Sequence, residues 1–208
     1  MDSREYFDSV AREWDTMQRS FFSEKVREKA FAVANIEEDK LAADIGAGTG
    51  FITEGLIRKG VRVIAVDQSK NMIGELRKNV SKATKIDFRV GSVEQLPIAD
   101  GTVDYVFANM LLHHVGSPPD AISEMTRILK PGGKIIITDL DEHNFEFLKT
   151  EHKDHWMGFK REEVRKWLSK AGLKNVGVDC VGENCCATSN SGCDKATVSI
   201  FVAFGQKS

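Results

Sequence analysis

Hydrophobic and polar positions along the chain alternate between two kinds of segment. Short apolar runs, typical of buried strands, occur at residues 41–45, 61–66, 86–90, 103–108 and 134–138. Apolar residues at helical spacing predict helices at residues 24–34, 51–58, 70–79 and 120–129. Gly60 and the sequence Pro131, Gly132, Gly133 are helix stop signals. Strands that alternate with helices predict an α/β fold with a doubly wound, mostly parallel sheet.

The last third of the chain has a different pattern. A polar segment with several histidines follows the fifth apolar run, and a helix is expected at residues 161–171. Two extended runs then cover residues 174–181 and 196–204. Residues 182–195 between them are the longest irregular piece, and their length is typical of a functional or disordered loop.

Three alternating glycines follow the first apolar run. The sequence LAADIGAGTG places Gly46, Gly48 and Gly50 between a predicted strand and a predicted helix. Glycine lets the backbone turn sharply and approach a ligand closely, and the helix start offers unpaired N–H groups. Because the spacing is GxGxG and not GxGxxG, the loop predicts a nucleotide-cofactor site other than a dinucleotide site.

An acidic residue ends the second apolar run. Asp67 lies 17 residues after Gly50, where a carboxylate accepts hydrogen bonds from both hydroxyls of a ribose. The alternative is a solvated strand end or a helix cap, although Ser69 is the better cap for the following helix. The glycine loop upstream favours the ribose role.

These motifs resemble those of the class I S-adenosylmethionine-dependent methyltransferases. The closest similarity is to the small single-domain branch that includes quinone C-methyltransferases and arsenite methyltransferases. DIGAGTG resembles the family's first motif, and Asp67 resembles its ribose-binding acidic residue. GSVEQLP resembles the loop on the adenine side. VDYVFANMLLHHV resembles the fourth strand of the family, and LKPGGKIIITD resembles the turn into the fifth strand. The similarity covers residues 6–139 and, more loosely, the rest. Ser92 stands where the family often has aspartate, so Glu94 or backbone groups are expected on the adenine side.

The resemblance implies a Rossmann-like methyltransferase fold over residues 1–208, with seven strands and an antiparallel last strand paired in a hairpin. It implies S-adenosylmethionine as the cofactor. It also implies that residues 1–35 form a helical lid carrying Tyr6, Phe7 and Trp14, the alternative being an ordinary core-facing helix stripe. The residues expected at the cofactor are Asp44, Gly46, Ala47, Gly48, Thr49, Gly50, Asp67, Gln68, Met72, Ser92, Val93, Glu94 and Asn109.

We expect a cytoplasmic protein, and the resemblance implies an enzyme that acts on a small molecule. The chain has 208 residues, enough for one domain, with 41% hydrophobic residues, 29% charged residues and a net charge of −2. This balance excludes the strongly basic face of a nucleic-acid-binding protein. No apolar run approaches the roughly 20 residues that span a bilayer. The sequence leaves the oligomeric state open.

All five histidines fall in segments that follow predicted strand ends, where ligands bind in open parallel sheets. His113 and His114 are candidate catalytic bases for an oxygen, nitrogen or acidic-carbon nucleophile, or they line the cofactor pocket. His143, His152 and His155 are candidate substrate or metal ligands, or they are solvated.

Four cysteines lie near the end of the chain. Cys180, in a predicted strand, is expected to be a small buried hydrophobe. Cys185, Cys186 and Cys193 fall in the polar loop ENCCATSNSGCD, where no apolar neighbours would bury them. Three interpretations of these cysteines remain open. They form a zinc site, although they lack the usual CxxC spacing, or they are thiols without a partner. In the third interpretation, their thiolates capture a thiophilic species such as trivalent arsenic. The last use resembles that of the arsenite methyltransferases.

The sequence therefore leaves three functional hypotheses open. In the first, the three loop cysteines hold a soft metalloid opposite the methyl group, and the metalloid's own lone pair attacks. In the second, a pocket binds a small organic acceptor, quinone-like or another nucleophile, and a histidine removes its proton. In the third, the protein senses S-adenosylmethionine without catalysis, because none of the cofactor motifs touches the acceptor.

Overall fold

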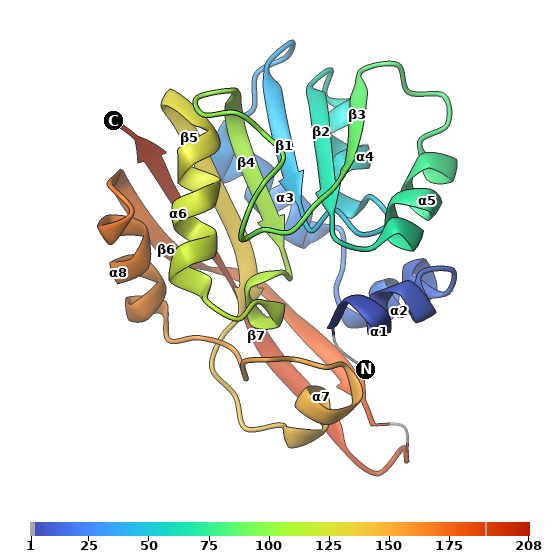
Figure 1. Cartoon of the computed structure of the whole chain (residues 1–208). Helices are drawn as coiled ribbons and strands as arrows, with labels where there is room; N and C mark the ends of the chain where they lie inside the picture. Colours follow the sequence, from blue (N-terminus) through green and yellow to red (C-terminus); the bar gives the residue numbers. More distant parts are fainter. Residues whose placement is uncertain (1–2, 190) are drawn as a thin grey trace.

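A computed structural model describes residues 3–189 and 191–208, so residues 1–2 of the expected lid and residue 190 of the expected loop lie outside the described residues. A seven-stranded sheet forms the middle of the molecule, in the order β3-β2-β1-β4-β5-β7-β6 (Figure 1). β7 is antiparallel to both of its neighbours, and the other pairings are parallel. The strands are β1 Leu41–Ile45, β2 Arg62–Asp67, β3 Ile86–Val90, β4 Val103–Asn109, β5 Leu129–Leu140, β6 Leu173–Thr188 and β7 Lys195–Lys207. The predicted fold class is confirmed.

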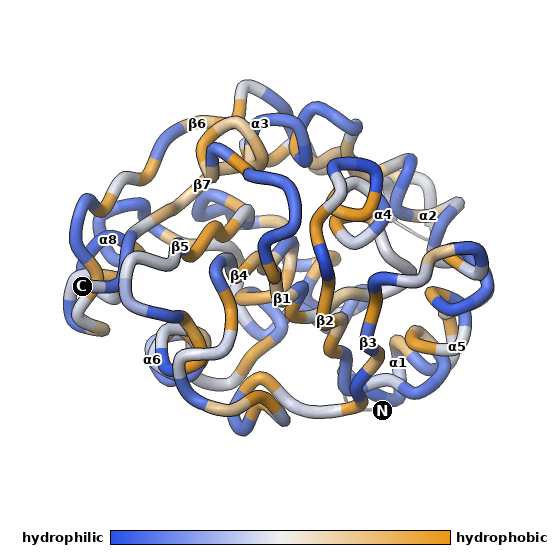
Figure 2. Tube along the Cα trace, turned by 90° about the horizontal axis from the view of Figure 1, so that it is seen from above, coloured by the Kyte–Doolittle hydropathy of each residue, from blue (hydrophilic) through white to orange (hydrophobic). Residues whose placement is uncertain are grey.

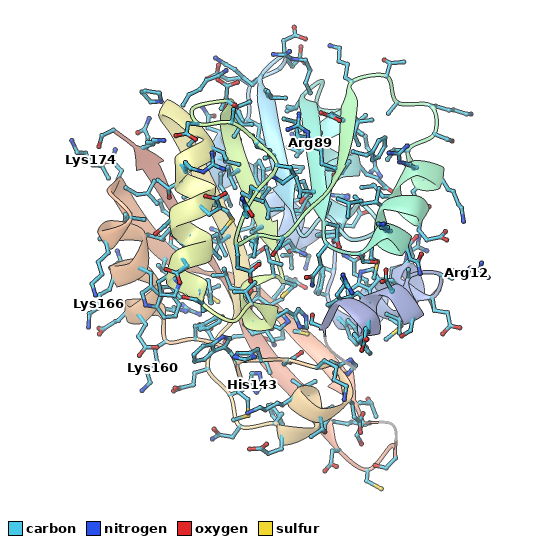
Figure 3. All side chains as sticks on the ribbon, in the orientation of Figure 1. Arg12, Arg89, His143, Lys160, Lys166 and Lys174 are labelled. Carbon is cyan, nitrogen blue, oxygen red and sulfur yellow. The ribbon has the colours of Figure 1, made fainter. Side chains whose placement is uncertain are left out.

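Helices cover both faces of the sheet. They are α1 Ser3–Val10, α2 Trp14–Phe21, α3 Lys25–Ala34, α4 Phe51–Arg58, α5 Lys70–Asn79, the 3-10 helix η1 Leu112–His114, α6 Pro118–Ile128, α7 Glu146–Glu151 and α8 Arg161–Lys170. α3 and α4 lie on one face, and α6 and α8 on the other (Figures 1 and 2). Hydrophobic residues run along the central strands, whereas Lys166 and Lys174 point outward (Figures 2 and 3). None of the described helices is long and apolar enough to cross a membrane.

Each face of the sheet buries a separate apolar cluster. Leu56 of α4 and Leu76 of α5 are fully buried on one face, and Met125 of α6 and Leu168 of α8 on the other. Side chains from neighbouring strand positions point to opposite faces, so the apolar strand runs supply both clusters. This explains why continuous apolar runs, and not alternating ones, mark the parallel strands.

The ends of several elements follow from local chemistry. The Ser69 hydroxyl accepts a hydrogen bond from the Met72 N–H at 3.0 Å and caps α5, as the sequence predicted. β1, β3, α4 and α5 coincide with their predicted ranges. β5 is longer than predicted, because Leu129 already pairs with Val103 before an irregular register at the Pro131 turn.

The prediction of an irregular segment at residues 182–195 is wrong for most of its length. β6 continues to Thr188 and β7 begins at Lys195, so strand replaces much of the expected loop. Ala196 and Val198 of β7 are buried and supply an apolar face for the polar strand that pairs with them. The resulting hairpin extends beyond the sheet toward α7 and the N-terminal helices (Figure 1). The expectation that Cys180 is buried is also wrong, because it is exposed on the edge strand β6.

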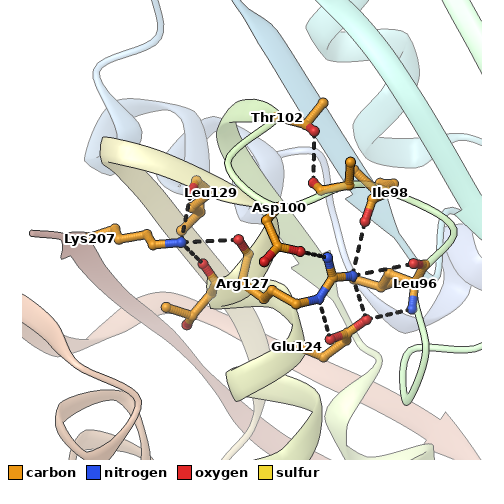
Figure 4. A network of polar contacts seen from close by, with 10 residues as sticks. Leu96, Ile98, Asp100, Thr102, Glu124, Arg127, Leu129 and Lys207 are labelled. Carbon is orange, nitrogen blue, oxygen red and sulfur yellow. Dashed lines mark hydrogen bonds and ion pairs between the residues drawn. The ribbon is translucent and has the colours of Figure 1, made fainter.

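A polar network fixes the segment that leads from β3 to β4 (Figure 4). The Arg127 guanidinium of α6 donates to the carbonyl oxygen of Ile98 at 2.9 Å and pairs with Glu124 at 2.7 Å. Glu124 accepts the N–H of Leu96 at 2.8 Å. Next to this network, the Lys207 ammonium donates to the carbonyl oxygens of Thr126, Arg127 and Leu129. The segment after β3 is thereby tied to α6.

Candidate active site

A pocket lies at the carboxyl ends of β1, β2 and β4, where open parallel sheets bind ligands. Twelve of the thirteen residues predicted for the cofactor line it: Asp44, Gly46, Ala47, Gly48, Thr49, Asp67, Gln68, Met72, Ser92, Val93, Glu94 and Asn109. We refer to it as the first pocket. The fold therefore brings together residues from four separate parts of the sequence.

Asp67 connects the glycine loop with the start of α5. One carboxylate oxygen accepts the Gly48 N–H at 2.9 Å, and the other accepts the Ser69 N–H at 2.8 Å. Burial raises the pKa of Asp67 to about 6, although these two N–H groups oppose the rise. A carboxylate oxygen accepts about two hydrogen bonds, so each oxygen retains capacity for a ligand hydroxyl.

Asp44 lies deeper, at the end of β1. Its carboxylate is 1% exposed and accepts the Thr53 hydroxyl at 2.6 Å. Burial raises the pKa of Asp44 to about 7, and the Thr53 hydrogen bonds only partly offset this. Asp44 therefore gains a proton more readily than an exposed aspartate.

Gly50 differs from the other predicted cofactor residues, because it is not among those that line the first pocket. It precedes α4 with a φ of 113°, and a Cβ at this position would lie 2.4 Å from Leu76 Cδ1. The glycine is required by backbone conformation and by packing against α5. Gly50 therefore has a structural role, and its contact with the cofactor stays a prediction.

The N-terminal helices cover the first pocket. Phe7, Trp14 and Gln18 are among its lining residues. Two carboxylates attach these helices to the pocket wall: Asp8 accepts the Ser69 hydroxyl at 2.5 Å, and Asp15 accepts the hydroxyl of Thr49. α1 and α2 lie over the first pocket, and moving them away would require these hydrogen bonds to break; a lid role stays a prediction.

A second pocket adjoins the first. Its lining is mostly aromatic and aliphatic, with a few titratable groups: Tyr6, Phe7, Trp14, Phe21, Phe22, Met110, His113, His114, Leu140, Leu148, His152, Asp154, Cys185 and Ala187. Phe7, Trp14, Phe22, Met110 and His114 line both pockets. A molecule in the second pocket is thereby adjacent to one in the first.

His113 is held by a carboxylate at the end of β5. Its Nδ1 lies 2.7 Å from Oδ1 of Asp139, which is fully buried and also accepts the Leu112 N–H at 2.8 Å. Burial disfavours charge on His113, but Asp139 and then Asp154 outweigh it and raise the pKa of His113 to about 9. The pair fixes the ring so that Nε2 is the nitrogen left for other partners.

Asp154 lies opposite both adjacent histidines. Its Oδ1 is 4.0 Å from His113 Nε2 and 3.8 Å from His114 Nδ1. Burial raises the pKa of Asp154 to about 6, and His113 opposes the rise. Burial, and then the charge on His113, lower the pKa of His114 well below its usual value. The 3.8 Å and 4.0 Å separations are too long for hydrogen bonds.

The structure does not bring together the three predicted metal-ligating histidines. His143 is buried between β5 and α7, where its Nδ1 accepts the Phe145 N–H at 3.2 Å (Figure 3). The Nδ1 of His152 is hydrogen-bonded to the Tyr6 hydroxyl at 3.3 Å, and His155 is exposed. Within residues 3–189 and 191–208, one group of three has its ligand atoms within 4.8 Å of one another: His113, His114 and Asp154.

The three cysteines assigned to metalloid capture are also separated. Cys185 and Cys186 are consecutive in β6, so their side chains point to opposite faces. Cys185 lines the second pocket and packs among apolar residues, which corrects the expectation that nothing apolar surrounds it. Cys186 and Cys193 are exposed. Burial, with a smaller effect from Asp154, raises the pKa of Cys185 to about 12.

Two residues of this region were missed from the sequence. Asp139 ends a predicted strand, the position that already identified Asp67, so the same rule would have found it. Asp154 offered no such signal, because it lies in an irregular polar segment 40 residues from His114. The hydrogen bonds from the His155 and Trp156 N–H groups to the His113 carbonyl bring it to the site.

Comparison with known proteins gives consistent matches. A family model described as a methyltransferase domain matches residues 43–137. The chain is 30% identical over 169 residues to a demethylmenaquinone methyltransferase of Thermobifida fusca, and the matched region covers 79% of this chain and 70% of that protein. It is 32% identical over 140 residues to the biotin biosynthesis bifunctional protein BioHC of Cellvibrio japonicus, covering 66% of this chain and 27% of that protein. An arsenite methyltransferase of Halobacterium salinarum is 33% identical over 117 residues, 54% of this chain and 29% of that protein.

Solved structures share the fold. A methyltransferase dependent on S-adenosylmethionine from Aquifex aeolicus has a TM-score of 0.71 at 19% identity, with 97% of this chain and 98% of that chain covered. A methyltransferase in complex with the Haloferax volcanii activator Trm112 has a TM-score of 0.77 at 21% identity, with 96% of each chain covered. At these identities the likeness concerns the arrangement of the strands and helices.

Proposed function

Because this chain belongs to the S-adenosylmethionine-dependent methyltransferases, we propose that it methylates a small organic acceptor in the second pocket and that His113 receives the acceptor's proton. One observation carries the proposal: His113, which Asp139 holds through Nδ1, lines an apolar pocket that adjoins the first pocket. Oxygen, nitrogen and acidic-carbon nucleophiles need a base of this kind.

The first pocket suits S-adenosylmethionine. The Asp67 carboxylate retains acceptor capacity for the two ribose hydroxyls, and Gly46 and Gly48 present no Cβ atoms at their two positions in the pocket wall. Ser92, Val93 and Glu94 would form the adenine side. When bound, S-adenosylmethionine supplies an electrophilic methyl group on a positively charged sulfur, and that charge favours the neutral, proton-accepting form of His113 nearby.

The protein's own groups then have three tasks. The glycine loop and Asp67 orient the cofactor, and such positioning alone contributes several kcal/mol to catalysis. Phe7 and Trp14, which line both pockets, exclude water from the region between them. The neutral form of His113, a minor fraction near pH 7 because its pKa is raised to about 9, takes the proton at Nε2, and Asp139 stabilises the resulting imidazolium through Nδ1.

The lining of the second pocket favours an acceptor with an apolar, ring-like body. Aromatic residues of the N-terminal helices form one wall, and Leu140, Leu148 and Ala187 contribute aliphatic contacts. A hydroxylated aromatic ring presents both an apolar face and an ionisable O–H group. The relative named as a demethylmenaquinone methyltransferase supports an acceptor of this class.

Arsenite is the less favoured acceptor. Of the three cysteines proposed to hold it, Cys185 alone lines the second pocket, and Cys186 points to the other face of β6. The arsenite methyltransferase matched above covers 54% of this chain, so its similarity extends to only part of the molecule. A single thiol does not replace the shared coordination that a metalloid requires.

The test is formation of S-adenosylhomocysteine, measured by mass spectrometry with a panel of hydroxylated arenes and with arsenite plus a thiol. Wild type is compared with His113→Ala, with Cys185→Ser/Cys186→Ser/Cys193→Ser, and with the exposed control His155→Ala. We expect turnover of a hydroxylated arene that survives the cysteine changes and falls at least about 100-fold in His113→Ala, while cofactor binding persists. Turnover of arsenite alone, lost in the triple variant, would reverse the choice of acceptor. Cofactor binding with no turnover of any acceptor would favour a sensor.

A further inference from the structure

The side chains of His113, His114 and Asp154 form a cluster whose geometry hydrogen bonding does not explain. His114 Nδ1 is buried and has no hydrogen-bond partner. A buried polar atom without a partner costs about 1–3 kcal/mol, so its persistence calls for a ligand or another compensation. The Oδ1 atom of Asp154 lies 3.8 Å from it, too far for a hydrogen bond.

The separations within this cluster suit a shared metal ion. In tetrahedral coordination, two ligand atoms about 2.0–2.2 Å from one zinc ion lie roughly 3.3–3.6 Å apart. Asp154 Oδ1 lies 3.8 Å from His114 Nδ1 and 4.0 Å from His113 Nε2, slightly farther than that spacing. All three ligand atoms lie within 4.8 Å of one another, so side-chain shifts on the order of 1 Å bring them to the tetrahedral spacing.

A second shell is already in place. Asp139 binds His113 Nδ1 at 2.7 Å, which directs Nε2 toward Asp154. Histidines that bind metals usually donate their other ring N–H to a carboxylate in this manner. Three hydrogen bonds hold the Asp154 segment against η1: the His155 and Trp156 N–H groups donate to the His113 carbonyl, and Trp156 Nε1 donates to the Val115 carbonyl at 2.8 Å.

We propose that His113, His114 and Asp154 bind one divalent d-block cation of the zinc class, and that its binding inhibits methyl transfer. Two imidazole nitrogens and one carboxylate oxygen are the donor set of open zinc-class sites, in which a further position remains for water or substrate. All three residues line the second pocket, so that position faces the acceptor. Inhibition follows because the ion occupies His113 Nε2. This second part rests on the proposed function, whereas binding of the ion does not.

Binding is tested with Zn²⁺ by calorimetry and with Co²⁺ by visible absorption, on the full chain after chelator treatment. The experiments use the Cys185→Ser/Cys186→Ser/Cys193→Ser background, which removes competing thiols. We expect one ion per chain, with the affinity reduced at least about tenfold in Asp154→Asn and in His114→Gln and unchanged in His155→Ala. Circular dichroism checks that each variant is folded. If Asp154→Asn does not fold, His114→Gln alone provides the test.

Inhibition is tested in the methyl transfer assay, first with a chelator present and then with rising Zn²⁺. We expect half-inhibition at the Zn²⁺ concentration that half-saturates the site, and no inhibition at that concentration in Asp154→Asn. Absence of stoichiometric binding, or equal binding by both cluster variants, would overturn the site and leave the proposed function untouched. Binding without inhibition would overturn the inhibitory role and the assignment of His113 as the base, while the metal site stands.

Discussion

The imidazole Nδ1 of His113 lies 2.7 Å from the Asp139 carboxylate, although 26 residues separate the two in the sequence. His113 follows β4 and Asp139 is near the end of β5, and these strands are parallel neighbours. The carboxyl ends of adjacent parallel strands meet at one edge of a sheet, so the fold itself creates the pair.

Asp139→Asn should lower kcat by about 100-fold, because a neutral amide does not stabilise an imidazolium as a carboxylate does. The dissociation constant for S-adenosylmethionine should stay within about threefold, since Asp139 is not among the residues lining the first pocket. Steady-state kinetics and calorimetry check the two quantities. Asp120→Asn, at an exposed position in α6, is the control. An equal loss of cofactor binding would point to a structural defect instead.

Affinity for S-adenosylmethionine should fall as the pH drops through about 6. Burial raises the pKa of Asp67 to about 6, and protonation removes acceptor capacity that the ribose hydroxyls require. Above this pH the carboxylate is ionised and binding is tight; below it, affinity should fall by roughly tenfold per pH unit. Asp67→Asn should bind weakly throughout, without this fall between pH 6 and 5. Calorimetry over pH 5–8 would contradict the assignment if wild type and variant changed in parallel.

Two glycines near the first pocket should respond oppositely to alanine. Gly50→Ala should destabilise the protein by about 3 kcal/mol, because φ is 113° and the new Cβ would lie 2.4 Å from Leu76 Cδ1. Gly74→Ala, within α5 and with no heavy atom within 4 Å of its new Cβ, should stabilise by about 0.5–1 kcal/mol. Urea denaturation gives both values. Similar effects at the two positions would show that backbone conformation and packing do not set the difference.

Cys185 should react with iodoacetamide at least about tenfold more slowly than Cys186 and Cys193, because thiolate is the reactive form. Burial raises the pKa of Cys185 to about 12, whereas the other two cysteines are exposed. Peptide mapping by mass spectrometry at timed intervals measures each site. In urea the three rates should converge, which is the internal control. Rapid labelling of Cys185 in the folded protein would restore it as a candidate for thiolate capture.

Lys207→Met should destabilise the protein by about 1–2 kcal/mol. The change removes an ammonium that donates to three carbonyl oxygens at the end of α6 but keeps the apolar stem (Figure 4). Lys174→Met, at an exposed position in β6, is a matched control that should have little effect. Thermal and urea denaturation provide the measurement. Equal effects of the two changes would mean that the hydrogen bonds at α6 contribute no net stability.

Local patterns predicted most of the central fold. The apolar runs located β1 and β3, and the Ser69 cap together with the helical spacing located α5. Local rules failed for the β6–β7 hairpin, because the sequence Gly182–Thr188 is polar and lacks strand-like alternation of its own. Its pairing depends on β7, whose Val198 and Ile200 belong to an apolar cluster with Phe22 and Leu148. A strand whose stability comes from a partner distant in the chain shows no strand-like hydrophobic pattern in its own sequence.

The sequence by itself determined the nucleotide half of the site. A glycine loop and Asp67 follow consecutive strands, and in a parallel sheet that order places them at one edge whatever the rest of the chain does. The tertiary structure alone decided the composition of the second pocket. It separated Cys185 from Cys186 on opposite faces of β6, left His143, His152 and His155 apart, and brought Asp154 to His113 and His114. The physical reason is that strand order fixes neighbours locally, whereas irregular segments are positioned by hydrogen bonds and packing between residues far apart in the chain.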